Sequence, residues 1–378
     1  MKIHISLVGK ETVPVYMGIV EVEPDEVILI HSANTKTECD RIKSVLSPNI
    51  KVQCKEFDPV DLKKIFYSLN KLRRNLLDKI QQEDKISLNL VGGTKFWSLA
   101  FYSVFNSMNN VSINLVDQQN NFWDFVAQKS KQLIPPSDIK IIFELNGNPT
   151  PKNIPFTNYT EEDFIIAQEV EKARKINVKD FNDLTIFKKS QQNELDKKEN
   201  ERTLQSGAKL IWAKPDYAQI TLYRRKSKKP IVTELRSPHA VAIVNNSHWF
   251  ELKIAKLLSN IYPKENIYMN CRFINNGTAQ NEVDIIVNTG NKLLFVECKT
   301  QITNTTDIDK FSTVVENYGG KSSKALFITD AKMSESVIRK CDKFNIAHFS
   351  LAEVKNNGQN ILESLQKILR TFINDINK

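Results

Sequence analysis

The stretch from Asn281 to Lys299 reads NEVDIIVNTGNKLLFVECK. Two β-rich runs flank the turn signal Asn288–Asn291, so this stretch predicts a β-hairpin. With a loop of two or four residues centred on that signal, Asp284 faces Phe295 across the hairpin. Asp284 and Glu297 then become diagonal neighbours, with Cα atoms about 7–8 Å apart.

Side chains alternate across a strand, so the predicted hairpin has one charged and one apolar face. The charged face collects Asp284, Phe295, Glu297 and Lys299. The apolar face collects Val283, Ile285, Val287, Leu294, Val296 and Cys298. Two nearby carboxylates suit a hard divalent cation such as Mg²⁺, with the backbone carbonyl of Cys298 as a third ligand. Lys299 would hold or activate a water on that ion and neutralise developing charge. The alternative is a charged face that simply meets solvent.

A second carboxylate signal lies upstream, where Asn246–Glu251 opens a helix and offers a good N-cap. The apolar stripe of this helix contains Trp249, Phe250, Ile254, Leu257, Leu258 and Ile261. Glu251 lies at the border of that stripe, and a carboxylate at the edge of a buried face needs a polar partner. We expect a metal-bound water as that partner. The alternative is a glutamate that only responds to the positive end of the helix dipole.

The first 130 or so residues alternate between strands and helices. Apolar runs suited to buried strands lie at 3–8, 27–30, 52–54, 86–91 and 111–116, and helical periodicity appears near 36–46, at 60–80 and after Thr94. Strands and helices in this order predict βαβ units and a mainly parallel sheet. In such sheets, ligands bind beyond the carboxyl ends of the strands.

Small polar loops follow three of these strands, at Val8–Thr12, His31–Lys36 and Gly92–Lys95. Glycines let a ligand approach the backbone, and a helix N-terminus offers free N–H groups to a phosphate. The chain has neither a GxGxxG nor a GxxxxGK[ST] motif, which disfavours NAD binding and P-loop NTP hydrolysis. Each loop taken alone can also be an ordinary βα turn.

Residues 131–239 are expected to form a connecting region, with a charged helical stretch at Ser190–Glu201 and a hairpin near Ala208–Tyr223. Five basic residues follow within six positions: Arg224, Arg225, Lys226, Lys228 and Lys229. They fit a surface beside the active site that binds nucleic-acid phosphates, or equally a solvated hairpin tip.

The overall composition agrees with a polyanionic partner. The 378 residues contain 53 Lys and Arg against 44 Asp and Glu, a net charge of +9. Five scattered cysteines without a CxxC pair argue against a disulfide framework or a zinc ribbon. No apolar run is long enough to span a bilayer, and the N-terminus lacks the pattern of a signal peptide. We therefore expect a soluble, cytoplasmic protein that does not enter a membrane.

The order and spacing of the carboxylates resemble the PD-(D/E)xK nuclease superfamily over about residues 240–350. Asp284, Glu297 and Lys299 match the core motif, and Glu251 matches a helical acid found in many members. Val283 stands where the motif has its proline. The resemblance implies a restriction-endonuclease-like α/β domain at 240–378. Lys310 receives no role.

The N-terminal domain, residues 1–130, resembles the Rossmann-like CARF sensor domains. The whole chain is thus similar to the two-domain CRISPR ancillary nucleases that cyclic oligoadenylate activates. This resemblance implies a homodimer, cyclic tetra-adenylate as activator, and cleavage of DNA, RNA or both with Mn²⁺ or Mg²⁺. The implied ligand residues are Gly9, Lys10, Thr12, Ser32, Asn34, Thr35, Gly92, Gly93, Thr94 and Lys95. Two other functions remain open: a ligand-responsive nucleic-acid-binding regulator without catalysis, and a restriction-type endonuclease with its own recognition domain.

Overall fold

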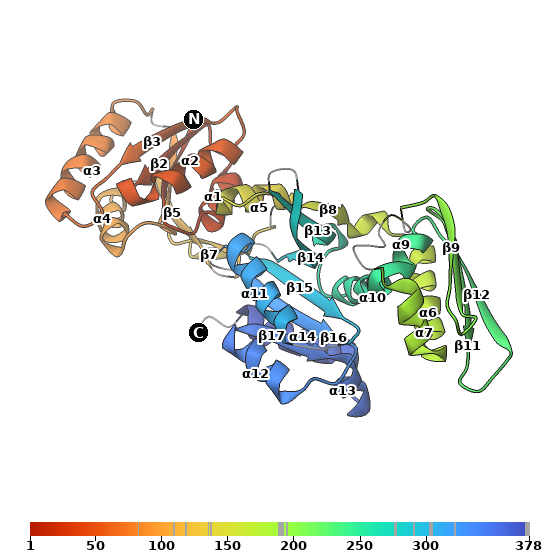
Figure 1. Cartoon of the computed structure of the whole chain (residues 1–378). Helices are drawn as coiled ribbons and strands as arrows, with labels where there is room; N and C mark the ends of the chain where they lie inside the picture. Colours follow the sequence, from red (N-terminus) through yellow and green to blue (C-terminus); the bar gives the residue numbers. More distant parts are fainter. Residues whose placement is uncertain are drawn as a thin grey trace.

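The computed structural model describes the chain except for residues 82, 109, 118, 135, 137, 188–192, 194–195, 276–277, 290–291, 302–304, 321–322 and 375–378. Within the described residues the strands form three sheets of seven, four and six strands. The seven-stranded sheet lies at one end of the molecule and the four-stranded sheet at the other, with the six-stranded sheet between them (Figure 1). No helix in the described part of the chain is long and apolar enough to cross a membrane.

The N-terminal sheet has the strand order β3-β2-β1-β4-β5-β6-β7. Its strands are β1 Lys2–Leu7, β2 Glu26–His31, β3 Lys51–Glu56, β4 Lys85–Asn89, β5 Val111–Val116, β6 Asn121–Asp124 and β7 Lys129–Gln132. The first five pair in parallel, while β6 and β7 extend the sheet in antiparallel fashion. The prediction of a mainly parallel α/β sheet is confirmed.

Helices cover both faces of this sheet. They are α1 Val13–Val22, α2 Lys36–Val45, α3 Leu62–Leu77 and α4 Lys95–Phe105. Because side chains alternate along a strand, Ile3, Ile5 and Leu7 of β1 all point into the core shared with α3 and α4. Val8 belongs instead to the core under α1 and α2.

The middle of the chain contains α5 Ile139–Asn146, β8 Lys152–Pro155, α6 Glu161–Ile176 and α7 Val178–Thr185. The four-stranded antiparallel sheet follows, with β9 Glu199–Thr203, β10 Lys209–Ala213, β11 Tyr217–Tyr223 and β12 Pro230–Arg236. The predicted hairpin near Ala208–Tyr223 is therefore confirmed. The predicted helix at Ser190–Glu201 is wrong at its end, because residues from Glu199 onward pair with β10; much of its beginning lies outside the described residues.

The C-terminal sheet has the order β17-β16-β15-β14-β13-β8, so a strand from the middle region forms one of its edges. Its other strands are β13 Ile267–Asn275, β14 Thr278–Asn288, β15 Leu293–Lys299, β16 Lys324–Thr329 and β17 Ile346–Ser350. The helices are α9 Ala240–Val244, α10 His248–Leu258, α11 Thr306–Tyr318, α12 Glu335–Lys343, α13 Leu351–Asn356 and α14 Ile361–Asn374. The domain boundaries stay a prediction, but the middle region shares a hydrophobic core with this sheet.

The predicted β14–β15 hairpin forms, but its register differs by two residues from the prediction. Asn288 pairs with Leu293 and Ile285 with Val296, so Asp284 and Glu297 are the next residues beyond the last regular pair on their two strands. The loop is closed by a hydrogen bond from the Thr289 N–H to the Lys292 carbonyl, one residue further along the chain than expected. Gly290 and Asn291 of the predicted turn lie outside the described residues. A shift of two residues keeps every side chain on its face.

The two faces of this hairpin are not charged and apolar, as predicted, but both buried. Ile285, Leu294 and Val296 pack into the core shared with α6 and α10. Phe295, predicted on the charged face, is fully buried in the opposite core, together with Val283. The strict alternation therefore breaks at Asp284. Because helices cover both faces, the charged residues gather at one end of the strands instead of along one face.

Candidate functional site

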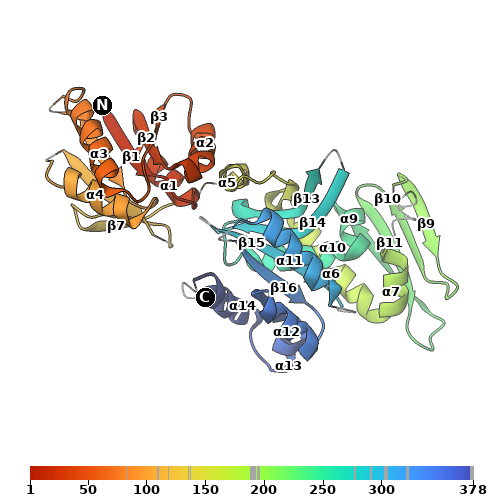
Figure 2. The same cartoon turned by 60° about the vertical axis from the view of Figure 1, so that its left-hand side comes forward.

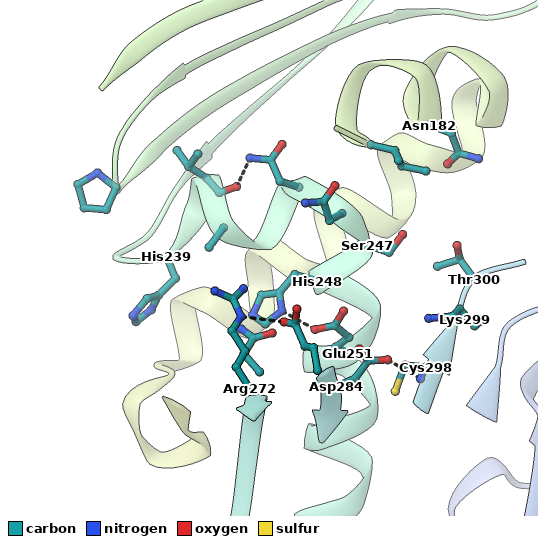
Figure 3. Close-up of a pocket in the computed structure, with 18 of the residues that line it drawn as sticks. Asn182, His239, Ser247, His248, Glu251, Arg272, Asp284, Cys298, Lys299 and Thr300 are labelled. Carbon is teal, nitrogen blue, oxygen red and sulfur yellow. Dashed lines mark hydrogen bonds and ion pairs between the residues drawn. The ribbon is translucent and has the colours of Figure 1, made fainter. Parts of the chain in front are cut away.

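A pocket of about 860 Å³ lies where the carboxyl end of β15 meets the start of α10 (Figure 3). One wall comes from the C-terminal sheet and α10, with Glu251, Asp284, Cys298 and Lys299. The opposite wall comes from the middle region, with Asn182, Lys214, Pro215, Pro238 and His239. The pocket therefore depends on segments up to about a hundred residues apart in sequence.

Of the predicted carboxylates and lysine, Glu251, Asp284 and Lys299 line this pocket, whereas Glu297 does not line it but pairs with Lys299. One oxygen of Asp284, Oδ2, accepts a hydrogen bond of 2.7 Å from the Cys298 backbone N–H. Oε1 of Glu297 lies 2.5 Å from Nζ of Lys299. The side chain of Glu297 is only 13% exposed, against 32% for Lys299. Lys299 therefore reaches the pocket, while its carboxylate partner lies beneath it.

Burial and crowding decide the protonation of this group. Burial, followed by the charges of Glu297 and Glu251, raises the pKa of Asp284 well above its usual range. Burial also raises the pKa of Glu297, although Lys299 acts against it. For Lys299, burial disfavours the charge, but Asp284 and Glu297 outweigh it and raise the pKa. The site thus contains more negative charge than its single lysine balances.

This excess of buried negative charge fits a divalent cation. Among the described residues no group of three or more His, Cys, Asp and Glu side chains is already arranged as a metal site. Mg²⁺ does not require such a cage, because it commonly uses one or two carboxylates and completes its shell with waters and substrate oxygens. Asp284 and Glu297 provide these hard ligands. Ligation by the Cys298 carbonyl stays a prediction.

Glu251, in the first turn of α10, also faces the pocket, and its Oε2 lies 2.7 Å from Nδ1 of His248. The predicted N-cap is wrong: Ser247 makes no capping hydrogen bond, and Asn246 and Ser247 adopt left-handed backbone conformations with φ of 51° and 67°. The helix therefore begins after a constrained turn, which aims His248 and Glu251 the same way (Figure 3).

Sequence reasoning missed the two histidines of this pocket. Nε2 of His248 lies 2.8 Å from the hydroxyl of Tyr159, and Nδ1 of His239 lies 2.9 Å from the fully buried Asp163. The spacing of His248 three residues before Glu251 was the one signal available in the sequence. The partners Tyr159 and Asp163 come from the other side of the pocket, and nothing in the local sequence points to them.

The basic run does not lie beside this pocket, so that prediction is wrong. Lys214 and Pro215 line the pocket at the start of β11, whereas Arg224–Lys229 form the exposed loop after the end of β11. The seven residues of β11 separate these points by about 20 Å. The basic run therefore forms the distant tip of the hairpin (Figure 1), and its binding to nucleic acid stays a prediction.

The three predicted ligand loops of the N-terminal sheet do converge on one edge. The backbone of Gly9 lies close to Gly93, and a Cβ on Gly92 would collide with the Leu7 carbonyl oxygen at 2.0 Å. Nζ of Lys10 donates 2.9 Å to the Asn34 carbonyl and pairs with Glu38. The loops after β1, β2 and β4 therefore form one surface at the carboxyl edge of the sheet.

The side chains of these loops differ in what they offer to a ligand. Lys10, Asn34, Gly93 and Lys95 are exposed on this edge. The hydroxyl groups of Ser32 and Thr35 hydrogen-bond each other, and that of Thr94 donates to the Pro59 carbonyl. Thr12 is buried, and its hydroxyl donates 3.0 Å to the Leu145 carbonyl of α5. In this arrangement Thr12 contacts the next helix instead of the open edge.

Residues 3–142 match the family model of the Card1 CARF domain. The N-terminal domain is of the CARF type. No curated protein matches the sequence of the chain.

Three solved structures share the fold of nearly the whole chain. Can2 from Sulfobacillus thermosulfidooxidans, solved in complex with cyclic tetra-adenylate, has 20% identity and a TM-score of 0.63 over 98% of this chain and 97% of its own. Protein VC1899 from Vibrio cholerae has 15% identity and a TM-score of 0.71 over 98% of each chain. A type III CRISPR defence DNA nuclease activated by cyclic oligoadenylate has 15% identity and a TM-score of 0.57 over 97% of this chain and 51% of its own.

Helix α5 joins the CARF domain to the C-terminal sheet, and it lies between them in both views (Figures 1 and 2). On the CARF side, Arg41 donates to the Asn146 carbonyl at 3.3 Å. A Cβ on Gly147, which has φ of +75°, would lie 2.1 Å from the Arg41 guanidinium carbon, so glycine is needed here. On the other side, Asn148 donates 2.8 Å to the Tyr318 carbonyl at the end of α11.

Tyr318 continues this connection towards the candidate site. Its ring stacks on Phe273 of β13 with 3.9 Å between the centroids, and Phe273 also contacts Phe143 of α5. The Tyr318 hydroxyl accepts 3.2 Å from Asn281, which lies on β14 three residues before Asp284. A continuous set of contacts thus joins the Gly9–Thr12 loop to the strand that holds Asp284.

The crowded carboxylates predict that the metal-free protein gains stability when Asp284 is made neutral. We expect Asp284→Asn to raise the free energy of unfolding at pH 8 by about 1 kcal/mol, a size common for stabilising substitutions, because the neutral amide relieves the buried, crowded charge that raises the pKa of Asp284. A raised folded-state pKa means that the native protein binds more protons than the unfolded chain, so wild-type stability falls as pH rises from about 4. The free energy of unfolding of the variant, measured by urea titration at several pH values, should fall less as the pH rises.

The matched control is Asp342→Asn, whose carboxylate is 66% exposed on α12. It should leave the stability unchanged. A wild-type protein whose stability rises between pH 5 and pH 8, with no gain in Asp284→Asn, would contradict the prediction.

Proposed function

We propose that this chain is a metal-dependent nuclease of the PD-(D/E)xK superfamily, activated by cyclic oligoadenylate, with cyclic tetra-adenylate as the ligand, in antiviral CRISPR defence. The observation that supports this most is the grouping of Asp284, Glu297, Lys299 and Glu251 at one pocket of a chain that also has a CARF domain. Binding of cyclic tetra-adenylate by Can2, which shares the fold, supports the choice of activator.

The chemistry follows from what each side chain can do. Asp284 and Glu297 would hold Mg²⁺ or Mn²⁺, which polarises the scissile phosphate and lowers the pKa of a water. A water releases a proton to solvent as its oxygen bonds to phosphorus, the P–O bond to the leaving group breaks, and the departing oxygen takes a proton from solvent. The raised pKa of Lys299 keeps it charged, so it stabilises the negative charge on phosphorus and does not act as a base. Glu251 is positioned to orient the attacking water with its free oxygen.

The shape of the site favours a polymeric substrate without base recognition. The pocket is about 860 Å³ and is lined by polar and charged groups from both walls, including Lys214 and Arg272. Cations in such a groove bind the phosphate backbone, which is common to single-stranded RNA, single-stranded DNA and plasmid DNA. We therefore propose a nucleic acid, bound through its phosphates, as the substrate.

The activator would bind at the carboxyl edge of the CARF sheet. Gly92 and Gly93 let a ligand approach the backbone, and the N-terminus of α4 follows directly. Lys10 and Lys95 add positive charge at the same edge. This combination suits a ring of phosphates.

Homodimerisation is supported by an apolar surface beside this edge. Three side chains on the outer side of α4 are exposed: Phe96 by 45%, Leu99 by 70% and Tyr102 by 44%. Leu62 and Phe66 of α3, which packs beside α4, are exposed as well. Clusters of this kind mark protein interfaces. A partner on this surface would bring two ligand edges together and both nuclease sites towards one cleft.

Activation can be passed on within one chain by α5. A ligand that moves the Gly9–Thr12 loop would alter the Thr12–Leu145 hydrogen bond, and α5 contacts Tyr318 through Asn148. Such coupling requires that the ligand binds the active arrangement more tightly than the resting one.

The first prediction is activator-dependent cleavage. We expect cyclic tetra-adenylate with Mn²⁺ or Mg²⁺ to switch on cutting of labelled single-stranded RNA, single-stranded DNA or supercoiled plasmid, and Glu297→Ala to abolish it because a buried metal ligand is lost. Gel assays measure this, with Glu335→Ala on the surface of α12 as the matched control. Cleavage that does not depend on the activator would contradict the proposed sensor role of the CARF domain. Binding of the activator without any cleavage would favour the alternative function, a ligand-responsive nucleic-acid-binding regulator without catalysis.

The second prediction concerns the α4 surface. We expect Leu99→Glu to make the protein monomeric by light scattering and to weaken activator binding at least tenfold, because burying a charge in an apolar interface is unfavourable. Val232→Glu, at an apolar position on β12 that is 51% exposed, should stay dimeric. A wild-type protein that is monomeric with activator bound would reject the dimer.

The third prediction tests the α5 connection. We expect Thr12→Val, which removes only the hydrogen bond to Leu145, to lower activator-stimulated cleavage about fivefold, as the loss of roughly 1 kcal/mol of coupling implies. Activator affinity, measured by calorimetry, should change less. Ser44→Ala removes an exposed hydroxyl from the same domain and serves as the control. Unchanged stimulation in Thr12→Val would rule out this connection.

A further inference from the structure

His248 links two walls of the candidate nuclease pocket, and both of its ring nitrogens are occupied. Nδ1 lies 2.7 Å from Oε2 of Glu251, and Nε2 lies 2.8 Å from the hydroxyl of Tyr159. The side chain of His248 is only 8% exposed and that of Glu251 only 13%. Tyr159, His248 and Glu251 therefore form a buried row that ends in a carboxylate facing the pocket; Figure 3 shows His248 and Glu251.

The chemistry of the partners fixes the direction of these hydrogen bonds. An ionised carboxylate only accepts, so the proton on this side belongs to Nδ1 of His248. In the neutral ring Nε2 is then an acceptor, and the Tyr159 hydroxyl donates to it. Burial, followed by the charges of Glu251 and Asp163, raises the pKa of Tyr159, so the hydroxyl keeps its proton. Each donor in the row points towards Glu251.

The backbone around His248 is constrained in a way that supports this arrangement. Asn246 and Ser247 are non-glycine residues with positive φ, a conformation that costs about 1 kcal/mol or more each. The Asn246 side chain accepts a hydrogen bond from the Phe187 N–H, which holds this turn. The turn starts α10 so that positions 248 and 251, three residues apart, share one side of the helix.

The far end of the row is also held in place. Tyr159 is buried, and its ring packs against the ring of His239 with 5.0 Å between the centroids. Nδ1 of His239 bonds to the buried Asp163, which also caps the start of α6. Tyr159 therefore has a fixed position set by the middle region of the chain.

We propose that His248, oriented by Tyr159, is a positioning residue that fixes the carboxylate of Glu251 for the nuclease reaction. This inference rests on the proposed function. Because both ring nitrogens are used, His248 neither takes a proton from the substrate nor gives one to it. It removes the rotational freedom of Glu251 and leaves one carboxylate oxygen directed at the reacting water.

The kinetic test separates the two hydrogen bonds of His248. We expect His248→Ala to lower kcat about 10- to 100-fold, as is typical when a supporting partner is lost, while KM for the nucleic acid stays unchanged. His248→Asn, whose amide N–H occupies nearly the place of Nδ1–H, should restore most of kcat. Tyr159→Phe should lower kcat by less than His248→Ala.

The control is His348→Ala, which removes a half-exposed histidine paired with Asp342 on the far surface of the C-terminal domain. It should cleave like the wild type. Equal loss in His248→Ala and His248→Asn would indicate a role in packing only and would overturn the proposal, as would full activity in His248→Ala.

A measurement that needs no cleavage tests the same geometry. In ¹⁵N-histidine-labelled protein above the ordinary histidine pKa of about 6.5, His248 should show the Nδ1–H tautomer, which free histidine populates less. Only five histidines contribute, and His248→Asn identifies the signal. An Nε2–H tautomer would overturn the proposal even if the wild type cleaves. If the wild type does not cleave, the Nδ1–H signal still supports the positioning of Glu251, and only the proposed function fails.

Discussion

The close approach of two buried carboxylates, Asp284 and Glu297, is the constraint on which the C-terminal domain depends. Their strands are adjacent, both residues follow the last regular pair of the hairpin, and the charge of Glu297 contributes to the raised pKa of Asp284. The charged form of each carboxylate is unfavourable in free energy unless a cation is nearby. Lys299 and the Cys298 N–H satisfy part of this demand, and the rest is the electrostatic basis for a divalent ion. The same excess of charge that lowers stability would favour binding of the divalent cation that we propose for this site.

This charge could be gathered in one place because the rest of the hairpin is apolar on both faces. α6 and α10 cover one face of the C-terminal sheet, and α11 and α12 cover the other. Polar groups are then tolerated only where the strands end, and the middle region closes over that end with His239 and Lys214. The pocket is thus a product of two segments that share a core, and neither segment forms it alone.

A short helix, α5, is one of the elements that tie the CARF domain to this core. α5 contributes Ile142 and Phe143 to a hydrophobic cluster that runs from α1 and α2 to the C-terminal sheet. Close packing transmits displacements because packed side chains cannot give way freely. The Thr12–Leu145 and Asn148–Tyr318 hydrogen bonds both lie at the carboxyl end of α5, where they link the Gly9–Thr12 loop to the end of α11.

The sequence by itself determined the alternating strands and helices, the hairpin, and the grouping of Asp284, Glu297 and Lys299, because these follow from periodicity and short spacing. The addition of Glu251 to that group rested on the resemblance to the PD-(D/E)xK superfamily. It placed the register two residues off yet kept the right faces, since the turn signal allows two centres and a shift of two preserves the alternation. Only the tertiary structure decided the rest. Tyr159 reaches His248 from 89 residues away, the basic run lies at the distant end of its hairpin, and Thr12 turns to α5. Those outcomes depend on how separate segments pack, and no local pattern encodes the partner that a side chain will meet.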